Sequence, residues 1–198
     1  PKYGNNIPVV DKEAACVAAR VSDMVAGLKN YLGNPFRPDW SSPSTHLTYG
    51  YWVGATPDGR SSREMMGYGI DPLFSHADSG LGFRTLSSMQ LPFGKMNGGC
   101  ASHFGIDPKY FTAETYEGKG VQFCERVLKP LFFNPGNPNR APFYLYVNVT
   151  TAETLRKVLA NPAKYAPRGV YIMRIHGTFV NFLDLSPAIQ EDIILRLD

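Results

Sequence analysis

The stretch "YIMRIHGTFVNFLDLSP", residues 171–187, decides the fold of the C-terminal part of the chain. One apolar run before Arg174 and a second after Thr178 predict two strands joined by a tight loop with Gly177 at its tip. A turn glycine is the simplest interpretation, because hairpin loops need a positive φ that glycine adopts without strain. The residues beside it are apolar or aromatic, however, and they indicate a buried loop. A buried turn would not carry Arg174 and His176 without a reason.

Upstream of this hairpin, helical and extended patterns alternate. Residues 143–150, "FYLYVNVT", predict a strand in which Asn148 shares one face with Tyr144 and Tyr146. Whether that face lines a pocket or packs on a helix is open. Thr150 and Glu153 have the spacing of a capping box at the start of a helix over 150–162.

Further elements follow from hydrophobic spacing and from turn residues. The patterns predict a helix over 11–32, a strand over 46–54, a turn over 55–62, a helix over 121–133 that ends at Pro130, and a last helix capped by Ser186. Helices that alternate with buried strands predict an α/β architecture.

Composition excludes several classes of protein. The chain has 198 residues, is 43% hydrophobic and carries a net charge of +3, so it has enough apolar residues for a packed core. Its basic residues are scattered, which argues against nucleic acid as a partner. It has neither a bilayer-spanning apolar stretch nor a signal-peptide pattern at its start, so we expect a cytoplasmic protein. Three cysteines, Cys16, Cys100 and Cys124, are an odd number without metal-ligand spacing and fit a reducing compartment.

Five motifs in order along the chain resemble the C-terminal region of the glycyl radical enzymes, the family of pyruvate formate-lyase. They are "KYGNN" (2–6), "TPDGR" (56–60), "LYVNV" (145–149), "NPAKY" (161–165) and "RIHGTFVNF" (174–182). The first departs from the family pattern, with Asn6 where Asp is usual.

The resemblance implies that Gly177 stores an organic radical. Loss of a hydrogen atom from its Cα would leave a planar radical delocalised into the flanking amides, and planarity is easiest without a Cβ. The implied neighbours on the radical loop are Arg174, Ile175, His176, Thr178 and Phe179.

The family also implies an architecture. This chain would be the C-terminal part of a ten-stranded α/β barrel with the glycyl radical loop at its centre. Residues 1–164 would belong to the barrel, and 165–198 would form the radical loop and the C-terminal helix. The family's relay cysteine, which becomes a thiyl radical, lies in an upstream Gly-Cys-Val-type motif that these residues lack. Cys100 in "NGGCASHFG" is the one glycine-flanked thiol, and a small buried hydrophobe is its more ordinary role.

The implied partners follow. A radical S-adenosylmethionine activating enzyme with an iron–sulfur cluster would generate the radical after translation, and this chain itself would bind no cofactor and no metal. For the activating enzyme to reach Gly177, the radical loop must leave its buried position. We therefore expect the segment 165–198 to swing out. The upstream part of the enzyme would supply the cysteine, and small accessory subunits and a homo- or hetero-oligomer are expected.

The subtype is predicted from the run after Gly177. His176-Gly177-Thr178 and "FVNFLDLSPAIQEDII" look most like the large subunits of benzylsuccinate synthase and its alkylsuccinate relatives. These anaerobic lyases add a hydrocarbon C–H across the double bond of fumarate. The alternatives are a formate acetyltransferase, a dehydratase or a decarboxylase of the same family, and a stand-alone radical-bearing subunit that repairs a damaged enzyme. A non-catalytic α/β module with a turn glycine is the third class.

Overall fold

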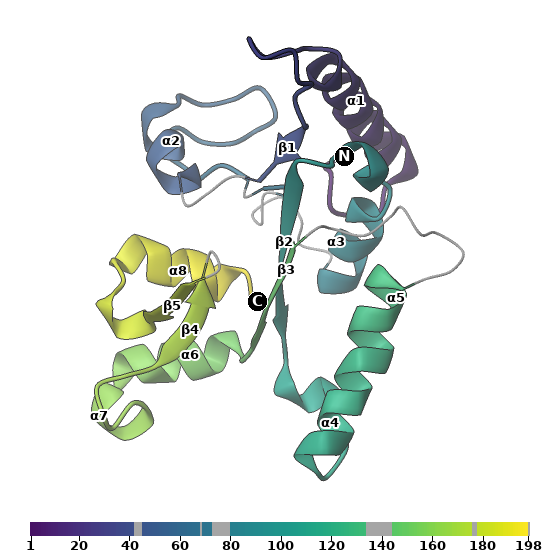
Figure 1. Ribbon diagram of the computed structural model, residues 1–198. Helices are drawn as coiled ribbons and strands as arrows, with labels where there is room; N and C mark the ends of the chain where they lie inside the picture. Colours follow the sequence, from purple (N-terminus) through teal and green to yellow (C-terminus); the bar gives the residue numbers. More distant parts are fainter. Residues whose placement is uncertain (42–44, 68, 73–79, 134–143, 176–177, 198) are drawn as a thin grey trace. The chain divides into compact units, whose positions relative to one another are not determined.

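The computed structural model describes residues 1–41, 45–67, 69–72, 80–133, 144–175 and 178–197 (Figure 1). Contacts divide the chain into two compact units. Unit 1 comprises residues 1–102 and 113–145, and unit 2 comprises residues 103–112 and 146–198. This division does not follow the predicted boundary after residue 164, which concerned roles along the chain and stays a prediction.

The described elements of unit 1 are mainly helical. Its helices are α1 (Pro8–Ala26), α2 (His46–Trp52), α3 (Leu81–Ser88), α4 (Tyr116–Phe123) and α5 (Lys129–Phe132), with a π-helical turn over Cys124–Leu128. Its core gathers side chains from α1 and from the segments around residues 70 and 91–100. They are Ala18, Ile70, Leu91, Phe93, Met96 and Cys100.

Three strands form a small sheet in the order β1-β2-β3. They are β1 (Asp39–Trp40), β2 (Gly99–Ile106) and β3 (Tyr144–Val149). β1 runs parallel to β2, with Trp40 opposite Cys100. β3 therefore stands at one edge of this sheet. The predicted strand over 143–150 is confirmed.

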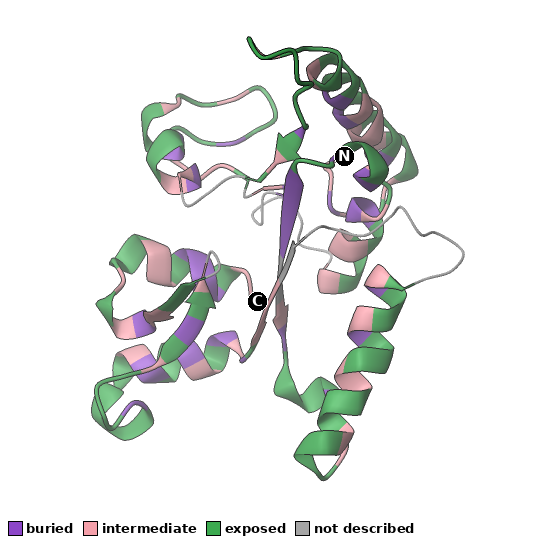
Figure 2. Ribbon diagram, viewed as in Figure 1, coloured by how far each residue is buried: buried purple, intermediate pink, exposed green. Residues whose placement is uncertain are grey.

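Unit 2 packs two helices against a hairpin. It contains α6 (Ala152–Ala160), α7 (Pro162–Tyr165), β4 (Ile172–Ile175), β5 (Thr178–Asn181) and α8 (Pro187–Leu195). Figure 1 shows α6 and α8 beside the hairpin, and Figure 2 shows the buried positions on these elements. The core consists of Ala152, Leu155, Val158, Ala166, Met173, Phe182, Ile193 and Ile194.

The predicted strand over 46–54 is wrong, because His46–Trp52 is helix α2. Aromatic and β-branched residues favour strands, but tertiary contacts override that preference. The helix brings His46 and Gly50, one turn apart, to the same buried face. A Cβ on Gly50 would lie 2.8 Å from the Met65 Cα, so the close approach of the segment around Met65 requires the glycine.

Pro130 does not end its helix, which continues to Phe132. A proline inside a helix lacks the N–H and clashes with the carbonyl four residues before it. Here the helix switches to a π turn just before the proline, and Lys129 N–H donates to the carbonyl of Cys124, five residues back. The wider turn moves the preceding carbonyls and so accommodates the ring.

Other boundaries shift by a few residues. The first helix is confirmed but ends at Ala26, with Gly27 as its cap, and not at Gly33. The cap of α6 is Thr151, whose hydroxyl accepts from Thr154 N–H, so the predicted capping box at Thr150 is off by one residue. The last helix, α8, starts at Pro187 as predicted, but the Ser186 side chain at its N-cap makes no capping hydrogen bond.

The described part of the chain mixes helices and strands, as the α/β prediction requires. Its five strands lie in two small sheets, and the ten-stranded barrel stays a prediction. Within the described residues, no helix combines the length and the apolar character needed to cross a membrane.

Candidate functional site

The candidate site is the hairpin of β4 and β5. The two strands are antiparallel, and their register places Ile175 opposite Thr178 and Arg174 opposite Phe179. The Thr178 hydroxyl also donates to the Ile175 carbonyl at 2.9 Å. The predicted strands on both sides of Gly177 are therefore confirmed. His176 and Gly177 themselves lie outside the described residues, so the radical role of Gly177 stays a prediction.

The side chains beside this tip are not buried within the chain. Phe179 is 71% exposed and Arg174 is exposed, whereas Met173 is only 4% exposed. Alternation along β4 sends Met173 into the core and Arg174 to the opposite face. The Arg174 guanidinium lies over the Phe179 ring, 5.4 Å from its centre, in a cation–π contact. This chain alone does not bury these two flanking side chains, and their burial in the whole enzyme stays a prediction.

Asn148 on β3 binds the backbone of β4. Its Nδ2 donates to the Arg174 carbonyl at 3.0 Å, and its Oδ1 accepts from Arg174 N–H at 3.2 Å. Nearby, the hydroxyls of Thr150 and Tyr171 share a hydrogen bond of 2.9 Å. The sequence left the role of Asn148 open; the structure shows that it holds neighbouring backbone.

A second asparagine, Asn181, holds the other end of the hairpin. Its Oδ1 accepts from Tyr171 N–H at 2.9 Å, and its Nδ2 donates to the Gly169 carbonyl at 3.0 Å. Sequence reasoning missed this role. The available signal was an asparagine inside a strand pattern, where this residue type is normally depleted.

The three cysteines occupy different environments and are free thiols. Cys100 is 1% exposed and belongs to the core of unit 1, as expected for a small buried hydrophobe. Cys16 on α1 is half-buried. Cys124 is exposed at the start of the π turn. In the described ranges, no three His, Cys, Asp or Glu side chains come together in a way that could hold a metal ion.

The "TPDGR" motif forms a turn that is organised by Arg60. This side chain is 4% exposed, and its guanidinium donates to the backbone carbonyls of Ser61, Glu64, Val53 and Gly54. The Thr56 hydroxyl donates to Asp58, and the turn places Gly59 at φ 100°. The turn predicted over 55–62 is confirmed, and the side chains of this motif stabilise it.

The "KYGNN" motif is joined to α1 and α3 through buried polar groups. Asn6 N–H donates to the Ser87 hydroxyl at 2.8 Å, and this hydroxyl donates to Asp11 Oδ2 at 3.1 Å. Asn6 has φ 52°, a left-handed conformation that Asn tolerates better than most residues. Asp11 is buried within the first turn of α1.

Tyr3 is half-buried against the core of unit 1, where its hydroxyl donates to the Ile70 carbonyl at 3.4 Å. Burial raises the pKa of the Tyr3 phenol far above its ordinary value, and the nearby carboxylates of Asp71 and Asp11 raise it further. The phenol is therefore held in its neutral form.

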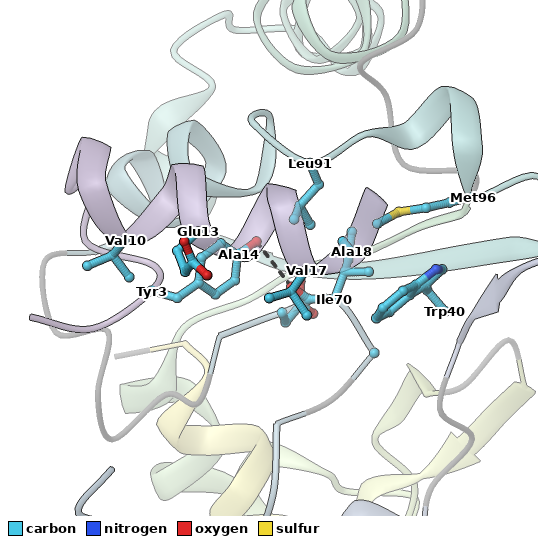
Figure 3. Close-up of a pocket in the computed structure, with 12 residues that line it drawn as sticks. Tyr3, Val10, Glu13, Ala14, Val17, Ala18, Trp40, Ile70, Leu91 and Met96 are labelled. Carbon is cyan, nitrogen blue, oxygen red and sulfur yellow. Dashed lines mark hydrogen bonds between the residues drawn. The ribbon is translucent and has the colours of Figure 1, made fainter. Parts of the chain in front are cut away.

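Tyr3 also lines a pocket of about 470 Å³ in unit 1 (Figure 3). In Figure 3, α1 supplies Val10, Glu13, Ala14, Val17 and Ala18 to this pocket. The remaining lining residues are Tyr3, Trp40, Gly69, Ile70, Asp71, Leu91 and Met96. Its walls are mostly apolar, so it favours apolar over charged contents.

Comparisons with known proteins agree with the fold of this region. The family described as Pyruvate formate lyase-like matches residues 1–50. A formate acetyltransferase of Haemophilus influenzae is 29% identical over 199 residues, which covers 99% of this chain and 25% of that enzyme. The chain thus spans a quarter of the length of this curated relative.

Two solved structures superimpose on almost the whole chain. A structure from work on 1,2-propanediol dehydration in Roseburia inulinivorans has a TM-score of 0.79 and 28% identity, over 99% of this chain and 22% of the other. A glycyl radical enzyme from Archaeoglobus fulgidus has a TM-score of 0.78 and 24% identity, over 100% of this chain and 24% of the other.

The family match is confined to residues 1–50, and the superpositions show a fold like that of these two structures. The predicted closeness to benzylsuccinate synthase is not shown by these comparisons, which include a formate acetyltransferase.

Proposed function

We propose that this chain is the radical-bearing part of a glycyl radical enzyme and that Gly177 stores the radical. The observation that carries the proposal is the register of the hairpin. Ile175 and Thr178 are paired across β4 and β5, which leaves His176 and Gly177 as the residues that connect the strands. The fold shared with glycyl radical enzymes supports the same assignment.

The chemistry explains why the residue is glycine. Removal of one Cα hydrogen atom gives a radical shared with the amide nitrogen on one side and the carbonyl on the other, which requires a planar Cα. A Cβ would clash with the adjacent peptide groups in that planar form, and glycine has none.

Radical formation and use would need two further components. A radical S-adenosylmethionine activating enzyme removes the hydrogen atom, and its iron–sulfur cluster carries that chemistry. A cysteine in another part of the enzyme receives the radical and starts substrate C–H abstraction. Cys100 is a poor relay candidate, because it is fixed in the core of unit 1. The cytoplasmic location and the accessory subunits belong to the same proposal.

For the reaction, we propose fumarate addition to a hydrocarbon, on the basis of the residues around Gly177. The curated relative instead favours formate acetyltransferase activity as the second candidate, and the Roseburia structure favours diol dehydration as a third. Product analysis of the activated enzyme with toluene and fumarate, pyruvate and coenzyme A, or 1,2-propanediol separates the three.

The radical assignment is tested by electron paramagnetic resonance after anaerobic activation of the intact protein. We predict that Gly177→Ala abolishes the organic radical signal and the activity without loss of the fold. Gly169→Ala is not a suitable control, because Gly169 has φ 68° and the substitution would strain the backbone. Gly120→Ala is suitable, since nothing lies within 4 Å of an added Cβ. An undiminished signal from the Gly177→Ala protein would exclude the assignment.

A further inference from the structure

One edge of β4 faces away from β5. In the hairpin, Phe182 N–H donates to the Tyr171 carbonyl at 2.8 Å. Residues of an antiparallel strand alternate in the direction of their backbone hydrogen bonds, so Tyr171, Met173 and Ile175 turn these groups toward β5. The N–H and C=O of Arg174 consequently point to the outer edge, where a strand needs another partner.

Asn148 supplies that partner. A carboxamide carries one carbonyl acceptor and an N–H donor, the same pair of groups that a peptide of a neighbouring strand would offer. The 3.0 Å and 3.2 Å bonds use both groups on one residue, Arg174. In the described residues, β3 and β4 belong to separate sheets. The side chain thus joins two sheet edges that no described backbone ladder connects.

We propose that Asn148 is a positioning residue that holds the Arg174 end of β4 against β3. Its two bonds end on Arg174, three residues before Gly177. Asn181 binds Gly169 and Tyr171 at the base of the hairpin, so the two asparagines hold opposite ends of β4. Breaking the two Asn148 bonds releases the Arg174 end of β4 from β3 and leaves the β4–β5 ladder intact. We call the two hydrogen bonds between Asn148 and Arg174 the clasp. The clasp follows from geometry alone, and its role in radical chemistry rests on the proposed function.

A side-chain clasp can be released without unfolding the strands. Each bond is an ordinary, neutral hydrogen bond whose groups can exchange to water at little net cost. Arg174 is exposed and Asn148 is half-buried, so water can reach both groups. Release of Arg174 from Asn148 therefore leaves Met173 in the core.

The clasp is tested by amide hydrogen exchange in the intact, unactivated protein. We expect Asn148→Ala to accelerate exchange of the Arg174 amide about tenfold, the loss expected for two ordinary hydrogen bonds. The Met173 amide, which faces β5, should keep its rate. Asn148→Asp retains an acceptor for Arg174 N–H but no donor, and should accelerate exchange less than Asn148→Ala.

Asn161→Ala is the matched control. Asn161 is also an asparagine of unit 2 that binds backbone, but it caps α7 through Lys164 N–H. Its loss should leave the Arg174 rate unchanged. Unchanged Arg174 exchange in Asn148→Ala would overturn the proposal, and so would equal acceleration at Arg174 and Met173, which would mean general loosening. If Asn148→Ala does not fold, the same comparison is made with Asn148→Asp.

A second readout connects the clasp to activation. With the activating enzyme present, Asn148→Ala should form the radical severalfold faster than the wild-type protein, while product formed per radical falls. A purely structural defect would lower both quantities, and that result would overturn the positioning role. Absence of any radical in the wild-type protein would instead refute the proposed function, and hydrogen exchange would still decide whether the clasp exists.

Discussion

At the scale of single residues, Asn148, Asn181 and Arg60 are polar side chains that bind backbone. Arg60 reaches four carbonyls, and each asparagine binds both donor and acceptor groups of β4 or of the residues before it. Side chains of this kind fix loops and strand edges that regular secondary structure does not satisfy. In this chain they hold the "TPDGR" turn and the two ends of the candidate hairpin strand.

Tyr3 gives a prediction at the same scale. Burial and the nearby Asp71 and Asp11 raise its pKa in the folded protein above the unfolded value of about 10. A raised pKa contributes stability that is fully present below the unfolded pKa and is lost as the pH rises above it. We expect the free energy of unfolding to fall by about 1 kcal/mol between pH 10 and pH 11 through this group.

The measurement is chemical denaturation from pH 8 to pH 11 with the Tyr3→Phe variant. This variant should lose the part of the alkaline destabilisation that Tyr3 contributes. Tyr116→Phe removes a phenol that is 92% exposed and should keep the wild-type profile. Identical profiles for the wild-type protein and Tyr3→Phe would contradict the assignment.

At the scale of elements, two neighbouring threonines, Thr150 and Thr151, are candidates for the N-cap of α6. The Thr151 hydroxyl accepts from Thr154 N–H at 3.0 Å, whereas the capping-box spacing had pointed to Thr150. Thr151→Ala should lower the free energy of unfolding by about 1 kcal/mol, because it leaves a helical N–H without its cap. Thr151→Ser keeps the hydroxyl and should be nearly neutral. Equal losses in the two variants, measured by chemical denaturation, would exclude the hydroxyl as the cap.

Local signals predicted the elements that local chemistry controls. The strand at 144–149, the hairpin around Gly177 and the helix after Ser186 follow from apolar runs and from capping residues that act within a few positions. The α2 helix could not be predicted in this way, since its glycine meets a segment that is distant in sequence. Likewise, no sequence pattern near Pro130 predicted the π turn that precedes it.

For the candidate site too, the sequence predicted the local features and not those that depend on tertiary structure. The position of Gly177 between two strands was predicted from the sequence and agrees with the register of the hairpin. The exposure of Phe179 was not predicted, because an aromatic residue in a strand pattern does not indicate which face of the strand is covered. The partner of Asn148 lies 26 residues away and needed the tertiary structure.

At the scale of the whole molecule, the chain represents a quarter of the formate acetyltransferase that it matches. Its two compact units each have a hydrophobic core. The proposed radical store and the buried Cys100 belong to different units. The proposed function assigns radical storage to the loop around Gly177 and radical transfer to a cysteine elsewhere in the enzyme.

Air sensitivity tests the central claim, storage of a radical on Gly177, most directly. A carbon radical reacts with dioxygen, and the backbone then breaks at the residue that carried it. Activated protein exposed to air should release a piece that begins near Thr178 and ends with "DIILRLD", identified by mass spectrometry. Protein that was never activated should stay whole after the same exposure. An activated, radical-containing sample that stays uncut, or that is cut at Gly98 or Gly99 instead, would contradict the assignment to Gly177.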